Sequence, residues 1–96
     1  MTILEEQTAA AHQYAELWRA VMSGVETPAD DQFLIWAGSY KKSQVVRGIN
    51  GAARKFRAMQ NASRSMTAND VARYAASIMR NERAGRHIFQ TATTAH

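Results

Sequence analysis

The apolar side chains of this 96-residue chain recur at spacings of three and four residues in four separate segments. That spacing places them on one face of an α-helix, and runs of β-branched residues are short. We therefore predict an all-α, compact four-helix domain whose helices cover about residues 3–23, 28–40, 43–60 and 68–84. Residues 1–85 form a single domain in this interpretation, and residues 86–96 form a short, partly ordered C-terminal tail.

Capping motifs define the starts of the first and fourth helices. Thr2 with Glu5, and Thr67 with Asp70, stand three residues apart, so that hydroxyl and carboxylate can accept bonds from free N–H groups of the first turn. Gly24 ends the first helix, because glycine readily adopts the left-handed conformation that closes a helix. These signals predict that the first helix covers about residues 3–23 and that the fourth begins at about residue 68.

The second and third helices begin at weaker signals. Thr27 can cap the second helix, Pro28 suits its first position, and Asp30 can return the capping bond. Ser43 can cap the third helix. Large apolar side chains from all four helices are expected in one shared core, namely Trp18, Trp36, Phe56, Tyr74 and Ile78.

The third segment contains "RGINGAARKFR", in which two glycines interrupt an otherwise clear helical pattern. Its apolar side chains fall on one side, and a narrow polar stripe faces away from them. The polar stripe consists of Arg47, Asn50, Arg54 and Arg57. Gly48 and Gly51 lie at the boundary between the two, and each costs about 1 kcal/mol relative to alanine in a helix. We expect close approach of a neighbouring helix to explain them.

Charge is distributed unevenly along the chain. Residues 1–40 carry six acids and one base, for a net −5, whereas residues 41–96 carry eleven bases and two acids, for a net +9. A half with that excess attracts anionic partners, of which nucleic acid is the commonest. Solvated arginines that face only water explain the same pattern equally well.

The composition also restricts the compartment. The chain has no cysteine, so neither a disulfide framework nor a thiolate metal site is possible. Its N-terminus, "MTILEEQ", lacks the features of a signal peptide, and no apolar run approaches the roughly 20 residues of a membrane span. We expect a cytoplasmic protein that does not associate with membranes.

Histidines and acids offer little catalytic chemistry. His12 and Glu16 are one helical turn apart, a spacing that can hold a metal, but no further ligand accompanies them and an exposed pair is favoured. Asp30 and Asp31 are adjacent, so they point about 100° apart on a helix and cannot share a proton or a metal. We therefore expect no metal site and no cofactor.

The segment "GSYKKS" resembles two catalytic motifs only superficially. Ser39 and Lys42 match Ser-x-x-Lys, but the other elements of that enzyme class are missing. Lys42 followed by Ser43 matches the end of a P-loop, but the second glycine is absent and no strand precedes it. With no nucleophile and base in sight, the chain is predicted not to be an enzyme.

The cations of the third and fourth helices form the candidate site. They align along one edge of each predicted helix or crowd the start of the third, where a phosphate would offset their unfavourable position on the helix dipole. The predicted nucleic-acid contacts are Lys41, Lys42, Arg47, Asn50, Arg54, Arg57, Arg73, Arg80 and Arg83.

Two further interpretations remain open. The basic surface, the tryptophans and the five methionines also suit a protein-interaction module that binds an acidic partner or forms a homodimer. Alternatively, the second and third helices form a helix-turn-helix in which Ser43, Gln44 and Arg47 face base edges.

Three segments carry a family resemblance: "FLIWAGSY" (33–40), "VVRGINGAA" (45–53) and "YAASIM" (74–79). In order and spacing, residues 8–83 resemble the DnaD-type C-terminal helical domain of bacterial primosome proteins and phage replisome organisers. The resemblance implies that the fourth helix and the segment after it contact DNA, and that the domain contacts a helicase-loading partner. The family's aromatic motif after the closing helix is not evident in "NERAGRHIFQ", and its N-terminal oligomerisation domain is missing. An accessory role in phage or mobile-element replication therefore fits best.

Overall fold

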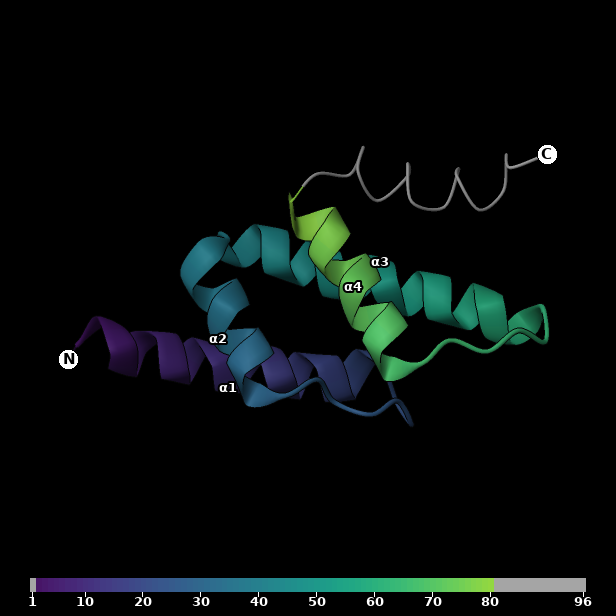
Figure 1. Cartoon of the computed structure of the whole chain (residues 1–96), viewed down its shortest axis with the longest axis horizontal. Coiled ribbons are helices and arrows are strands. Elements are labelled where there is room, and N and C mark those ends of the chain that lie inside the picture. The colour runs from purple at the N-terminus through teal and green to yellow at the C-terminus, as the bar shows by residue number, and fades with distance from the viewer. Residues whose placement is uncertain (1, 81–96) are drawn as a thin grey trace.

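A computed structural model of the chain describes residues 2–80 and confirms an all-α domain of four helices (Figure 1). No strand occurs within this part of the chain. The helices are α1 (Ile3–Val21), α2 (Asp30–Ser39), α3 (Lys42–Asn61) and α4 (Ala68–Arg80). The extension of the fourth helix to residue 84, Arg83 and the predicted tail at 86–96 all lie outside the described residues.

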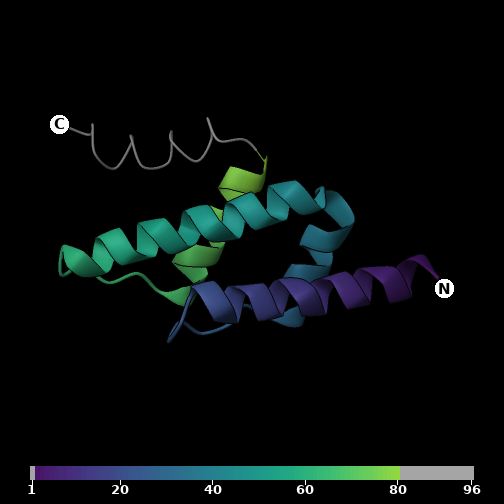
Figure 2. The same cartoon turned by 180° about the vertical axis from the view of Figure 1, so that it is seen from behind.

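The helices form two layers. The long helices α1 and α3 lie in one layer, and the short helices α2 and α4 lie in front of them in Figure 1 and behind them in Figure 2. The most extensive contacts join α3 to α4 and α1 to α2, and α1 also packs on α3. Because α2 and α4 share a layer, residues of these two helices that are far apart in sequence can line the same space.

Both predicted capping boxes form. Thr2 Oγ1 accepts a 3.1 Å bond from the N–H of Glu5, and Thr67 Oγ1 accepts a 3.1 Å bond from the N–H of Asp70. Each carboxylate returns a bond to the N–H of its threonine, at 3.4 and 3.3 Å. Gly24 has φ of +83°, as its predicted role after the first helix requires.

The predicted starts of the second and third helices are wrong by one or two residues. Helix α2 begins at Asp30 after Ala29, whose side chain has no oxygen to cap it, and Thr27 and Pro28 precede the helix. Helix α3 begins before Ser43, because the N–H of Lys41 donates to Oε1 of Gln44 at 2.9 Å. Gln44, the third residue of the helix, thus returns a bond to the residue that precedes α3, and Ser43 lies inside the helix.

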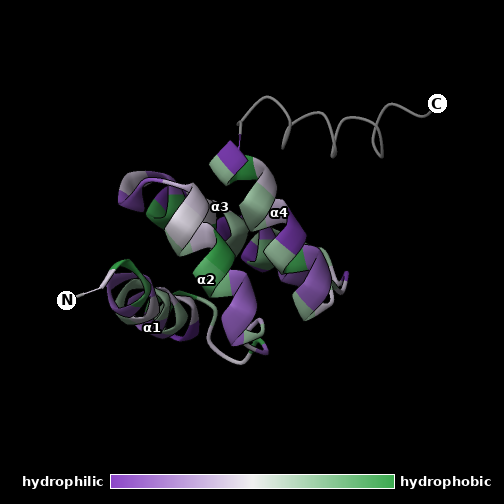
Figure 3. Ribbon diagram, turned by 60° about the vertical axis from the view of Figure 1, so that its left-hand side comes forward, coloured by the Kyte–Doolittle hydropathy of each residue, from purple (hydrophilic) through white to green (hydrophobic). Residues whose placement is uncertain are grey.

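An aromatic cluster of Trp18, Phe33 and Trp36 forms the centre of the core, where the apolar side of α2 enters the bundle (Figure 3). Ring centroids lie 5.2–6.3 Å apart, within the range of favourable aromatic pairs. Trp18 and Trp36 are buried as predicted. Phe56 and Tyr74 are only half-buried, so their placement in the core was wrong; they pack against its rim.

The glycines of α3 allow α4 to approach closely, which confirms the predicted reason for them. A Cβ atom on Gly48 would lie 2.7 Å from the backbone oxygen of Ala75 and 2.6 Å from Cγ of Met79. A Cβ atom on Gly51 would lie 2.6 Å from Cδ1 of Ile78. All three separations are shorter than real Cβ contacts. At Gly48 the contact includes a backbone atom of α4, so the two backbones pack there at a distance that a larger residue would prevent, whereas at Gly51 only the end of a side chain would have to move.

Candidate nucleic-acid interface

The polar stripe of α3 remains at the surface beside α4. Arg47, Asn50 and Arg54 are all exposed, while the glycines on the flank of the stripe are buried against α4. The Arg54 guanidinium is close enough to Tyr74 of α4 to act on it. Burial raises the pKa of the Tyr74 hydroxyl, and the positive charge of Arg54 partly opposes that rise. Arg54 therefore borders α4.

Arg57 contacts a different helix from Arg54. Although it is exposed, its guanidinium donates a 3.1 Å hydrogen bond to the backbone oxygen of Val21, at the end of α1. A cation at this position satisfies one of the unpaired carbonyls of the helix terminus and favours the negative end of the dipole. Arg57 thus joins α3 to α1.

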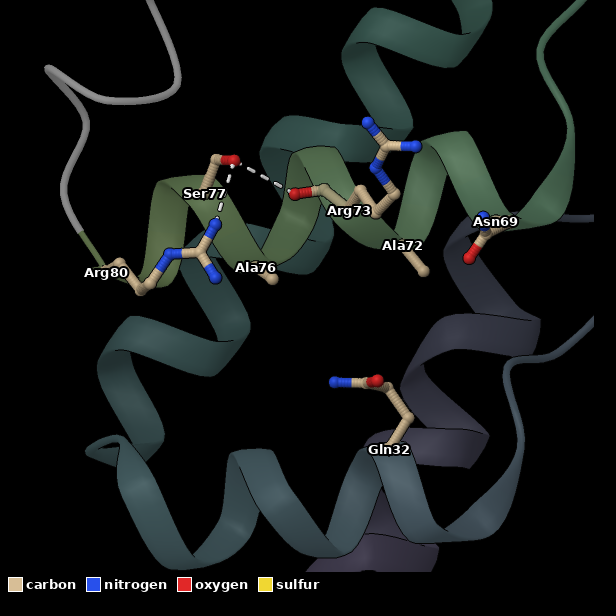
Figure 4. A pocket seen from close by; sticks show the side chains of 7 residues that line it. All are labelled: Gln32, Asn69, Ala72, Arg73, Ala76, Ser77 and Arg80. Atoms are coloured by element: carbon tan, nitrogen blue, oxygen red, sulfur yellow. Dashed lines mark hydrogen bonds between the residues drawn. The ribbon is translucent and has the colours of Figure 1, made fainter. Parts of the chain in front are cut away.

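Arg73 and Arg80 of α4 both line a pocket of about 320 Å³ between α2 and α4 (Figure 4). Both are exposed, and Ser77 lies buried between them. The Ser77 hydroxyl donates to the backbone oxygen of Arg73 at 3.0 Å and accepts a 3.4 Å bond from the Arg80 guanidinium. This chain of bonds orients Arg80 along the pocket's edge.

The pocket also has polar side chains that the sequence did not associate with the arginines. Gln32 reaches from α2 toward α4, and Asn69 lines the same space from the start of α4 (Figure 4). The methyl groups of Ala72 and Ala76 form the wall opposite Gln32. Gln32 and Asn69 are 37 positions apart in the chain, and no motif connects them, so only the shared layer of α2 and α4 reveals the pair.

A second hollow of the same volume continues from the first. It shares Gln32, Asn69 and Ala72 with the first pocket, and it adds Glu26 and Asp31. The combined groove is therefore basic at the end near Arg80 and acidic at the end near Glu26.

The lysines at the start of α3 are exposed, but the neighbouring glutamine is occupied. Gln44 accepts from the N–H of Lys41 with its side-chain oxygen and donates with its side-chain nitrogen to the backbone oxygen of Met79, at 3.2 Å. Of the three side chains expected to face base edges in a helix-turn-helix, Ser43 and Arg47 are exposed, and Gln44 is held within the fold.

Residues 2–80 contain no group of three or more histidines and acids arranged to hold a metal. His12 and Glu16 are both exposed on α1, and Asp30 and Asp31 are both exposed at the start of α2. Across the same residues, no helix combines the length and apolar character that crossing a membrane requires.

Comparisons with known proteins add no relative: no family model matches the chain, and no curated protein or solved structure matches it either. The resemblance to DnaD-type helical domains stays a prediction from the three quoted segments. The candidate interface accordingly depends on its own geometry and charge.

Proposed function

We propose that this protein is a non-enzymatic module that binds nucleic acid through phosphate contacts made by the arginines of α3 and α4. One observation carries the proposal: residues 41–80 contain nine lysines and arginines and a single acid, Asp70. That acid bonds to the N–H of Thr67 in a capping box. The segment that forms α3 and α4 therefore carries a large excess of positive over negative side chains.

Four arginines are proposed as the main contacts: Arg47 and Arg54 on α3, and Arg73 and Arg80 at the pocket. Their planar guanidinium groups donate paired hydrogen bonds to phosphate oxygens. Contacts of this kind determine affinity and carry no direct sequence information, so binding to generic DNA is expected. Arg57 makes a smaller contribution here, because its guanidinium is bonded to Val21.

Fluorescence anisotropy of a labelled DNA duplex at about 50 mM and about 200 mM salt tests the proposal. We expect Arg54→Ala and Arg73→Ala each to weaken binding at the lower salt concentration. Arg19→Ala is the matched control, since Arg19 is an exposed arginine of α1 in the acidic half of the chain. No binding at the lower salt, or equal effects of all three variants, would refute the proposal.

A protein-interaction role is the second candidate, and exposed apolar side chains favour it. Ile3, Leu4 and Ile35 are 75%, 65% and 55% exposed, on α1 and α2. Apolar side chains of this size at the surface suit a protein interface, including one between two copies of the chain. Light scattering over a range of concentrations tests the homodimer, and a strict monomer at high concentration would exclude it.

By its resemblance to DnaD-type domains, the proposed module would serve as an accessory factor in phage or mobile-element replication. By the same resemblance, the helix that carries Arg73 and Arg80 would contact DNA, which agrees with the charge argument. A helicase-loading protein is the partner that the same resemblance implies.

A further inference from the structure

The groove between α2 and α4 differs from a surface that follows a nucleic-acid backbone. Such a surface offers positive charge along its whole length, so that successive phosphates find a partner. In this groove Arg73 and Arg80 line one hollow, and Glu26 and Asp31 line the other. A strand that ran along it would bring a phosphate against two carboxylates.

The basic end has the dimensions and donors of a small-ligand site. Its volume of about 320 Å³ is at the lower limit of pockets that hold small molecules. Two guanidinium groups of α4 supply positive charge. The side-chain amides of Gln32, on α2, and Asn69, on α4, supply hydrogen-bond donors and acceptors. Ala72 leaves room for a ligand because its side chain is a single methyl group.

The charge of the two arginines matches one particular form of phosphate. A phosphate monoester carries a charge of about −1.5 to −2 at neutral pH, whereas each internal phosphodiester of a strand carries only −1. Ser77 further restricts Arg80 by accepting a bond from its guanidinium. The oriented Arg80 guanidinium, together with the second guanidinium of Arg73 in the lining of the same pocket, therefore favours the dianion over the internal linkage.

We propose that the α2–α4 pocket binds a terminal phosphate monoester, as found at a phosphorylated strand end or on a mononucleotide. Arg73 and Arg80 bind its oxygens, Gln32 and Asn69 contact the attached nucleoside, and the acidic end of the groove excludes a second phosphate. For strand ends the inference rests on the proposed function, since the α3 cations would bind the rest of the strand. For mononucleotides it stands independently.

The test compares single-stranded 12-nucleotide oligonucleotides that carry either a 5′-phosphate or a 5′-hydroxyl, with a 3′ fluorophore, at about 100 mM salt. We expect the phosphorylated strand to bind about tenfold more tightly, the ratio that one good charge-assisted bond provides. A 3′-phosphorylated strand with a 5′ fluorophore distinguishes the two ends. Full-length protein is used throughout.

Variants assign the preference to the pocket. Arg80→Ala should reduce the ratio between phosphorylated and hydroxyl strands to about one. Ser77→Ala should lower the same ratio without any change in net charge, because Arg80 loses its hydrogen-bond partner. Arg54→Ala should weaken both strands equally and leave the ratio unchanged. Melting temperatures of all variants show whether the buried Ser77 position tolerates alanine.

The two proposals fail in different ways. Equal binding of phosphorylated and hydroxyl strands by the unmodified protein would overturn the pocket assignment and leave the proposed function intact. No binding of either strand would refute the proposed function, and titrations with AMP and adenosine would then decide the inference. AMP binding that Arg80→Ala abolishes would support it, and no AMP binding would overturn it.

Discussion

Replacement of Gly48 by alanine tests the packing that holds the two basic helices together. The added methyl group would lie 2.7 Å from the backbone oxygen of Ala75 and 2.6 and 2.9 Å from Cγ and Cε of Met79. The Met79 side chain can adopt another rotamer, but the carbonyl of Ala75 belongs to the backbone of α4. Relief of that contact requires α4 to move away from α3 by several tenths of an ångström.

Two opposing terms set the magnitude. Alanine is favoured over glycine in a helix by about 1 kcal/mol. Overpacking a core costs about 1–3 kcal/mol, and the upper end applies because backbone atoms must move. We expect Gly48→Ala to lower the free energy of unfolding by about 2 kcal/mol. In a domain of this size, that loss corresponds to a decrease in melting temperature of about 8–16 °C.

Gly51→Ala is the matched control, measured by circular dichroism during thermal and urea unfolding. Its methyl group would meet only the end of the Ile78 side chain, which can turn at a cost of about 0.5–1.5 kcal/mol. The gain in helix propensity offsets that cost, so stability should stay within about 1 kcal/mol of the unmodified protein. A Gly48→Ala protein as stable as the Gly51→Ala protein would refute this account of the packing.

Three further predictions concern the core and its borders. Trp36→Phe should cost about 1 kcal/mol less than Trp18→Phe in urea unfolding, because the buried Nε1 of Trp36 has no hydrogen-bond partner among residues 2–80, whereas that of Trp18 donates to a carbonyl at 3.3 Å. Arg57→Ala should lower the free energy of unfolding by about 0.5–1 kcal/mol through loss of its bond to the end of α1, and a stability equal to the unmodified protein would contradict that role. The raised pKa of Tyr74 favours its neutral form in the fold, so this stabilisation is present below the ordinary tyrosine pKa of about 10 and is lost as pH rises through the folded value. Arg54→Ala should raise that pKa further in an ultraviolet titration, and a lowered pKa would show that Arg54 does not act on Tyr74.

The features predictable from the sequence were those that depend on neighbours within one helix. Apolar periodicity predicted four helices, and the capping box of Thr67 and Asp70 predicted the start of α4, because the participating groups are three residues apart. Gly48 was predictable for a different reason. A glycine beside an apolar stripe has a helix-propensity cost that close packing of a partner explains.

The features that the sequence could not predict depend on which helix lies against which. Phe56 was expected in the core because the apolar pattern placed it on the core side of α3. The pattern did not show how far the partner helices extend over that position, and Phe56 is only half-buried. Arg57 belongs to the same stripe as Arg54, and only the position of Val21 shows that its guanidinium bonds to α1. The pocket residue Gln32 is likewise contributed by a helix that no local pattern connects to α4.

The dependence of DNA affinity on salt concentration tests the central claim most directly. If arginines of α3 and α4 contact phosphates, the logarithm of the association constant should fall linearly with the logarithm of salt concentration, by about 0.9 for each contact with a duplex. Arg54→Ala, Arg73→Ala and Arg80→Ala should each reduce that slope by about 1, and Arg19→Ala should leave it unchanged. A slope that none of the three substitutions alters, or a protein that binds no DNA at about 50 mM salt, would contradict the account.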